Sequence, residues 1–156
     1  MAILKIVKTD NDEGFLRKKS REVTEITPRI KTLLDDMIET MRFANGCGLA
    51  AVQVGVLRRI VVIETEEGLF EFINPKIIAK AGSQESEEGC LSVPGKWGIT
   101  KRPMYVTVRA TDRNGEEFEL RAEGLLAKAI CHELDHLEGI LYTDKVIRML
   151  GENEIE

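Results

Sequence analysis

The order of patterns along the chain predicts an α+β protein whose strands pair mostly antiparallel. Two segments carry apolar residues at helical spacing, and the stretch between them holds short β-branched or alternating runs separated by turn residues. These patterns do not alternate regularly, which argues against a parallel sheet built from repeated β–α–β units. The expected order is therefore one helix, a group of antiparallel strands and a second helix.

The first predicted helix begins at Pro28, since Thr27 is a suitable N-cap and proline suits the first helical position. Apolar side chains then recur three and four residues apart as far as Met41. The pair Asn45-Gly46 should end the helix. Upstream of it, the Asn-Asp-Glu-Gly run at residues 11–14 predicts a turn.

The first two strands are predicted at residues 60–64 and 69–73, around an acidic turn at residues 66–68. Asn74-Pro75 should break the second strand, because proline cannot donate a hydrogen bond to a neighbouring strand. Residues 76–79 could continue that strand at an edge of the sheet.

A polar stretch, residues 83–88, precedes a predicted hairpin. Residues 104–110 alternate strongly, and the Arg-Asn-Gly run at residues 113–115 is a hairpin turn into residues 118–122. The second helix should cover residues 125–137.

Gly139 is suitably placed to end this second helix. The tail, residues 144–156, could add a short last helix.

Composition and charge exclude several classes of protein. The 156 residues are 43% hydrophobic and 31% charged, with a net charge of −5, which argues against a nucleic-acid binder. The longest aliphatic run, residues 60–63, falls far short of the roughly 20 residues that a membrane helix needs. The chain has three cysteines and no recognisable export signal. We therefore expect the cysteines to be free thiols or metal ligands rather than partners in disulfides. We expect a single domain over residues 1–156, a cytoplasmic enzyme or binding protein.

The two histidines of the chain, His132 and His136, lie in one short motif, His-Glu-Leu-Asp-His. Positions four apart share a helix face, so both imidazoles can reach one metal ion. Glu133 lies about 100° round the helix, near a water on the metal. The alternative is a pair of surface histidines on an amphipathic helix, but the motif favours a metal site.

A catalytic metal of this kind usually has three protein ligands, and the third is left open by the motif. Cys90 is one candidate, although a lone cysteine is more often a buried structural residue. The other candidate is a downstream residue, as in zinc proteases. Their extended motif is matched up to Gly139, but Tyr142 stands where its last histidine would be. This departure weakens the protease interpretation.

Three motifs together resemble peptide deformylase. They are Gly-Cys-Gly-Leu-Ala-Ala-Val-Gln at residues 46–53, Glu-Gly-Cys-Leu-Ser at residues 88–92 and His-Glu-Leu-Asp-His at residues 132–136. The resemblance covers about residues 27–145. It implies an α+β domain in which antiparallel strands surround the central helix that carries the two histidines.

The resemblance also implies a role for each motif residue. Cys90, His132 and His136 would bind one divalent metal, Fe²⁺ in the cell, with Ni²⁺, Co²⁺ or Zn²⁺ also accepted. Glu133 would be the general acid and base. The side chain of Gln53 and the backbone N–H of Leu91 would stabilise the developing oxyanion, whereas a surface glutamine that caps the loop is the alternative for Gln53. The substrate would be the N-formylmethionyl peptide of a nascent chain, and formate would leave.

Residues next to these motifs could bind substrate or support the metal. Two backbone segments could pair with an extended peptide. The first is Gly46, Cys47 and Gly48, and the second is Glu88 and Gly89. Leu125 and Ala129 could line a methionine pocket or be plain core. Arg102 could pair with Asp135 and brace the metal helix, or be a solvated surface arginine.

Three features depart from the family pattern. Cys131 stands before the first histidine where glutamine is common, and we expect it to be a core or pocket-wall thiol. The N-terminal segment lacks proline, and the tail after Asp144 is short. We expect a transient contact with the ribosome, no association with a membrane and no direct binding of nucleic acid. The rivals are a small zincin-type metalloprotease and a non-catalytic metal-binding module.

Overall fold

Two antiparallel sheets form most of the computed structural model, which describes residues 2–151. The five-stranded sheet has the order β1-β2-β3-β6-β7, and the three-stranded sheet has the order β4-β5-β8. The strands of the first sheet are β1 (Gly48–Ala50), β2 (Ile60–Thr65), β3 (Gly68–Ala81), β6 (Tyr105–Thr111) and β7 (Glu117–Glu123). Those of the second are β4 (Gln84–Cys90), β5 (Val93–Arg102) and β8 (Val146–Met149). The predicted α+β architecture with antiparallel strands is confirmed.

Three α-helices accompany the sheets: α1 (Thr9–Leu16), α2 (Pro28–Phe43) and α3 (Gly124–Leu137). Helix α2 begins as expected, and the Thr27 side chain accepts a hydrogen bond from the Ile30 N–H at 3.3 Å. Helix α3 carries both histidines of the chain. Two short 3₁₀ helices cover residues 51–54 and 142–144.

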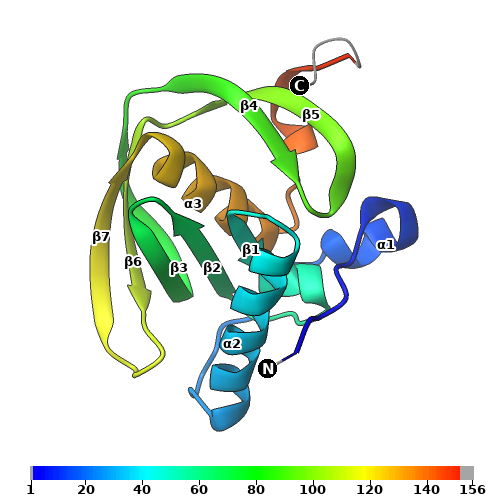
Figure 1. Ribbon diagram of the computed structural model, residues 1–156. Coiled ribbons are helices and arrows are strands. Elements are labelled where there is room, and N and C mark those ends of the chain that lie inside the picture. Colours follow the sequence, from blue (N-terminus) through cyan, green and yellow to red (C-terminus); the bar gives the residue numbers. More distant parts are fainter. Residues whose placement is uncertain (1, 152–156) are drawn as a thin grey trace.

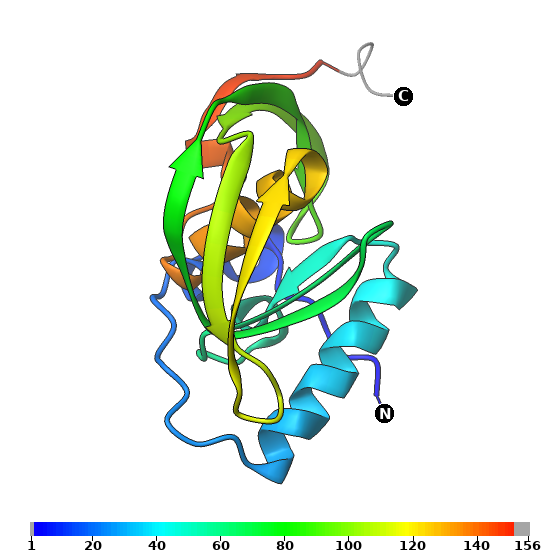
Figure 2. The same cartoon turned by 90° about the vertical axis from the view of Figure 1, so that its left-hand side faces the viewer.

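Helix α3 lies inside a curved wall of strands, with β4 and β5 arching over one side of it (Figure 1). The main core fills the space between α3 and the five-stranded sheet, and its buried members include Ile63, Phe72, Val108 and Ile130. Helix α2 packs against β1 and β2, where Leu34 and Met37 meet Leu49 and other residues of a second core. Figure 2 shows α2 outside the strands that enclose α3.

Two local expectations near turn residues are wrong. Residues 11–14 lie within α1 rather than in a turn, although Asp12 has non-helical angles that kink the helix. Asn74-Pro75 does not end the second strand, because Asn74 adopts a left-handed conformation (φ 52°) and β3 continues through an irregularity in its pairing. Strand β3 is also interior, between β2 and β6, rather than at an edge.

The three-stranded sheet was not predicted from the sequence. The polar residues 83–88 fall largely in β4, which pairs with β5, and the inward-facing positions of this pair include the buried polar residues Glu88 and Thr100. A strand whose inward side chains are polar lacks the apolar alternation that predicts strands. The expected C-terminal helix is also wrong as far as residue 151, where the chain forms a 3₁₀ turn and β8; residues 152–156 lie outside the described part. Within the described residues, no helix is long and apolar enough to cross a membrane.

Candidate metal centre and active site

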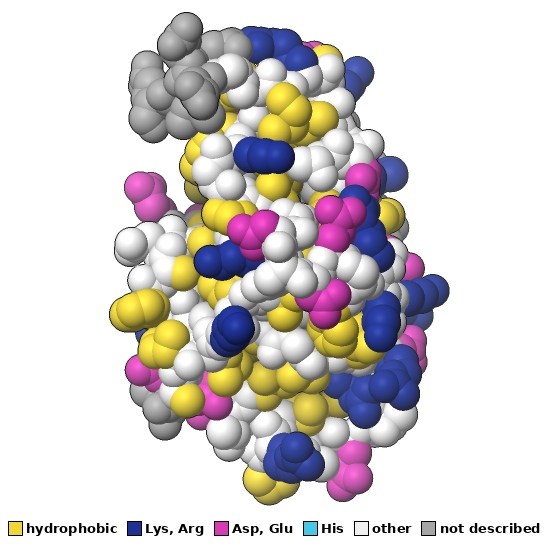
Figure 3. Space-filling view, turned by 90° about the vertical axis from the view of Figure 1, so that its right-hand side faces the viewer, with side chains coloured by type: hydrophobic (Ala, Val, Ile, Leu, Met, Phe, Trp, Pro, Cys, Tyr) yellow, Lys and Arg dark blue, Asp and Glu magenta, His cyan; other side chains and the backbone are white. Residues whose placement is uncertain are grey.

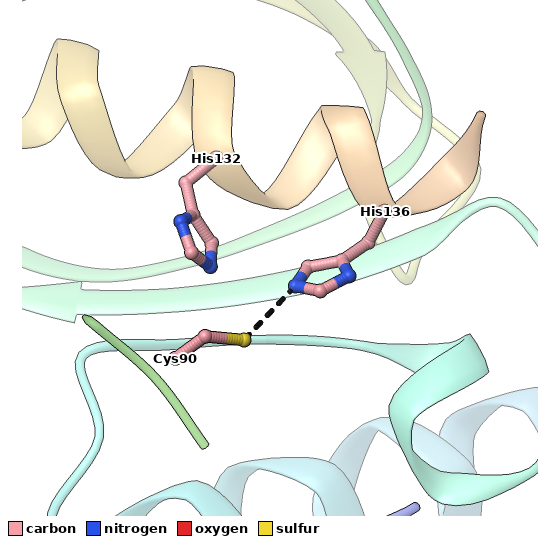
Figure 4. Close-up of side chains that lie close together, drawn as sticks. All are labelled: Cys90, His132 and His136. Atoms are coloured by element: carbon pink, nitrogen blue, oxygen red, sulfur yellow. Dashed lines mark hydrogen bonds between the residues drawn. The ribbon is translucent and has the colours of Figure 1, made fainter. Parts of the chain in front are cut away.

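Three potential ligand atoms converge where the last residue of β4 faces helix α3. The side chains of Cys90, His132 and His136 have one ligand atom each within 4.8 Å of the other two. The Sγ of Cys90 lies 3.3 Å from Nε2 of His136. Figure 4 marks this contact with a dashed line. Both histidines are buried, and no histidine is visible on the face drawn in Figure 3. The interpretation as surface histidines is therefore wrong.

The Glu88 carboxylate orients His132. Its Oε1 lies 2.7 Å from Nδ1 of His132, which leaves Nε2 of that ring to face Cys90 and His136. Arg102 donates to both carboxylate oxygens at 2.8 and 3.0 Å, and the Thr100 hydroxyl donates to Oε2. Burial opposes ionisation of Glu88, but the hydrogen bonds from His132 and Arg102 hold its pKa well below the usual range. Glu88 is thus a buried anion that accepts a hydrogen bond from the His132 imidazole.

Arg102 connects Glu88 to the helix that carries the histidines. Its Nη1 lies 2.7 Å from the Asp135 carboxylate, and the Arg102 side chain is almost fully buried. Lys145 also contacts Asp135. The alternative of a solvated surface Arg102 is wrong.

Glu133 projects from the same helix, with its side chain beside the cluster. Its Oε2 lies 3.9 Å from Nε2 of His132, and its Oε1 is buried without a hydrogen-bond partner. Burial raises the pKa of Glu133 to about 7. The carboxyl group lies directly against Gly48, where a Cβ atom would be only 2.5 Å from Oε2. A group of this kind can both take and return a proton near neutral pH.

Gln53 is buried next to Cys90, so the surface-glutamine alternative is wrong. Its Oε1 accepts from the Ala50 N–H at 2.9 Å, which fixes the amide orientation. Its Nε2 donates to the Ser92 hydroxyl at 3.0 Å and lies 3.6 Å from Cys90 Sγ. Leu91 follows Cys90 directly and packs against Gly46. A fixed amide donor therefore lies beside the candidate metal centre.

A cleft of about 630 Å³ opens over this cluster. Most of the predicted site residues line it, namely Gly46, Cys47, Gly48, Gln53, Glu88, Gly89, Cys90, Leu91, Leu125, Ala129, His132 and Glu133. Leu125 is 55% exposed, whereas Ala129 is buried and also belongs to the main core. His136, Arg102 and Asp135 are not among the residues that line it. Cys131 is buried in the main core and is not one of the three clustered residues.

Several residues of the cleft were not predicted from the sequence. Lys128 lies one helical turn before His132, and its ammonium group donates to the Glu87 carbonyl at 2.9 Å; helical spacing alone could have found it. Lys96 and Trp97, both from β5, also line the cleft. No motif marks those two residues, because their position depends on how β4 and β5 pair.

The donor set fits a divalent transition metal. One thiolate and two imidazoles are a common soft and borderline combination for zinc, iron or nickel. Burial, the neighbouring His132 and Arg102 hold the pKa of His136 below its usual range, which favours the neutral imidazole that binds metals. Nδ1 of His132 is hydrogen-bonded to the Glu88 carboxylate, and a carboxylate is a common outer partner of a metal-binding histidine. The geometry therefore suits a metal with three protein ligands.

Comparison with known proteins identifies one family over nearly the whole chain. The family described as "Polypeptide deformylase" matches residues 3–151. The chain is 56% identical over 153 residues to a peptide deformylase of Acetivibrio thermocellus, which covers 98% of this chain and 89% of that protein. It is 58% identical over 156 residues to one from Caldicellulosiruptor bescii, covering 100% of this chain and 93% of that protein.

The chain belongs to the polypeptide deformylase family. Its fold is also similar to crystal structures of peptide deformylases. One is from Legionella pneumophila, with a TM-score of 0.86 and 40% identity over 97% of this chain and 88% of that chain. Another is from Synechococcus elongatus in complex with actinonin, with a TM-score of 0.87 and 37% identity over 97% of this chain and 81% of that chain. The resemblance to peptide deformylase seen in the three motifs is confirmed.

Proposed function

We propose that this chain hydrolyses the N-formyl group from N-formylmethionine at the start of newly made polypeptides and releases formate. One observation carries the proposal: Cys90, His132 and His136 converge beside a buried Glu133 under an open cleft, in a chain that is similar to peptide deformylases over nearly its full length. The cleft also argues against a closed, non-catalytic metal module.

We assign Cys90, His132 and His136 as ligands of one divalent metal. The ion supplies Lewis acidity, which lowers the pKa of water enough to make hydroxide available near pH 7. The resemblance favours Fe²⁺, with Ni²⁺, Co²⁺ and Zn²⁺ as alternatives. Glu88 serves this site by keeping Nε2 of His132 directed at the ligand cluster.

The side chains around the metal would then carry the proton and the developing charge. Glu133, with a pKa of about 7, accepts the proton of the attacking water and passes it to the amine that leaves. The Gln53 amide and the Leu91 N–H donate to the formyl oxygen as it gains negative charge. A fixed donor of this kind contributes roughly 2.7–4 kcal/mol to the transition state.

The two strand edges beside the cleft suit an extended peptide. Within residues 2–151, β1 pairs only with β2, and β4 pairs only with β5, so each leaves one edge unpaired. Residues 46–48 and 88–89 line the cleft on these edges and could add the peptide as a further strand. Leu125 and Ala129 would contact the methionine side chain.

The proposed function also implies where the protein acts and what it contacts. We expect residues 1–156 to act as a single catalytic domain in the cytoplasm, with a transient ribosome contact where the substrate emerges. The net charge of −5 gives no basis for tight binding to ribosomal RNA.

The test is formate release from formyl-Met-Ala-Ser by the iron-loaded protein, prepared without oxygen. We expect rapid release by the wild type and loss of at least about a thousandfold in Glu133→Ala with metal content unchanged, because the other buried carboxylate of the cleft, Glu88, is already held by His132 and Arg102. Glu116→Ala, an exposed glutamate in the β6–β7 turn, is the matched control and should retain full activity.

Failure of the wild type to release formate from a metal-loaded site would refute the proposal. Cleavage of an internal bond in an unformylated peptide would instead favour the zincin-type protease. The upstream position of Cys90 and the tyrosine at residue 142 both argue against that outcome.

A further inference from the structure

Tyr142 has no part in the chemistry described above, yet it lies against the metal centre. It stands where the extended protease motif would carry its last histidine, in the 3₁₀ helix that follows α3. Its side chain is 1% exposed. A tyrosine buried this completely needs a partner for its hydroxyl, because an unpaired buried hydroxyl is costly.

The ring and the hydroxyl of Tyr142 have different neighbours. The ring stacks on the His132 imidazole, with 5.9 Å between centroids and 25° between planes. It also belongs to a small core with Leu141 and Val93, against which Cys90 packs. The hydroxyl donates to the carbonyl of Lys96 at 3.0 Å. One side chain thus touches a metal-site histidine and holds the backbone of β5.

The segment that receives this hydrogen bond is a bulge in the β4–β5 pair. The pairs Glu88–Gly98 and Cys90–Val93 are two residues apart on β4 but five residues apart on β5. Residues 94–97, which we call the cleft bulge, therefore lack partners in the register with β4. All four of these residues line the cleft.

Contacts from other elements hold the cleft bulge in place. The Trp97 ring covers Gly89 so closely that a Cβ there would lie 2.6 Å from the ring. The Leu150 N–H donates to the Trp97 carbonyl at 2.8 Å. Tyr142 supplies the contact that comes from the side of the histidine helix. The Tyr142 hydroxyl therefore links the bulge to the side chain that stacks on His132.

We propose that Tyr142 is a positioning residue for substrate: its hydroxyl holds the cleft bulge at a set distance from His132, so that the wall facing the peptide is ordered before the peptide binds. The inference rests on the proposed function, in which this cleft takes the peptide. Removing the hydroxyl leaves the ring on His132 and so leaves the ligand cluster intact. The loss should appear in substrate binding rather than in the chemical step.

The chain offers a matched pair of variants and an internal reporter. It has two tyrosines and one tryptophan. Tyr142→Phe removes the hydroxyl at the bulge, and Tyr105→Phe removes one from a side chain that is 51% exposed. Trp97 lies in the bulge itself, so its fluorescence reports on that wall alone. Quenching by acrylamide can be measured with and without metal.

For Tyr142→Phe we expect the KM for formyl-Met-Ala-Ser to rise about three- to tenfold, the usual effect of losing one buried hydrogen bond, with kcat within twofold of wild type. Acrylamide should quench Trp97 more strongly, and metal content should not change. Tyr105→Phe should match the wild type in all four measurements.

Two results would overturn the inference. One is a Tyr142→Phe protein with wild-type KM and wild-type Trp97 quenching. The other is a loss confined to kcat, metal content or melting temperature, which would mean that the hydroxyl has a general structural role. If the wild type releases no formate, the proposed function fails, and Trp97 quenching alone decides whether Tyr142 orders the bulge.

Discussion

Replacing Gly48 by alanine should disable Glu133 without touching the ligands. An added Cβ would lie 2.5 Å from Glu133 Oε2, 2.9 Å from its Cγ and 3.0 Å from its Cδ. To restore an ordinary contact of 3.4 Å, the carboxylate must move by about 0.9 Å. Displacements of about 1 Å in an active site can cost roughly a hundredfold in rate, so we expect kcat to fall about a hundredfold.

The backbone at Gly48 does not require glycine, because its φ angle lies outside the left-handed region. Alanine therefore acts through the contact rather than through backbone strain. Gly14→Ala is the matched control: its Cβ would meet one atom, at 3.7 Å, and its φ angle is also ordinary. That variant should keep wild-type activity.

The assay is formate release, with metal content and melting temperature measured on the same samples. A double-mutant cycle gives the sharper result, since Gly48→Ala should have little further effect in a Glu133→Ala background. Wild-type kcat in Gly48→Ala would refute the reasoning. So would equal losses from Gly48→Ala with and without Glu133, because the contact would then not be the cause.

Three further predictions concern the metal and the termini. Glu88→Gln should weaken metal binding by about 10–100-fold in a competition titration, because the outer partner of His132 loses its charge; Glu87→Gln, on the exposed neighbour, should not. The iron-loaded protein should lose activity in air faster than the nickel-loaded protein, because a ferrous centre beside the Cys90 thiolate is readily oxidised; equal half-lives would contradict this. The hydrogen bond from Arg17 holds the pKa of Asp144 below its usual range. The pair therefore stabilises the fold fully at pH values above the unfolded-state pKa of about 3.9. This stabilisation is lost as the pH falls through the lower pKa of Asp144 in the folded state. Arg17→Ala should therefore lower the free energy of unfolding by no more than about 1 kcal/mol at pH 7, since both side chains are over a third exposed, and the difference should shrink towards pH 2 in urea titrations.

Local patterns predicted the parts of the fold whose residues lie close together in the sequence. Helix α2 follows from its apolar period and its Thr27 cap, and β6 and β7 follow from alternation around a turn. The β4–β5 pair was missed because the inward face of the pair includes the buried polar residues Glu88 and Thr100. These residues are satisfied by an arginine and a histidine from other elements, which no local window can show.

The candidate site divides in the same way. The histidine motif predicts its own geometry, because helical spacing sets the two side chains on one face. Glu88 was expected to bind the peptide through its backbone. The contact of its carboxylate with His132 was not predicted, because it depends on the packing of β4 against α3. Trp97 reaches the cleft through a change of register that leaves no trace in the sequence.

The candidate ligands come from two separately hydrogen-bonded parts of the molecule. Cys90 ends a strand of the three-stranded sheet, whereas the histidines lie on the helix that packs against the five-stranded sheet, and 46 residues separate Cys90 from His136. A cation bound by all three would therefore act as a cross-link that closes a long loop. Chelation should then loosen β4, β5 and β8 first, so hydrogen exchange should accelerate in that sheet before it does in β2 and β3.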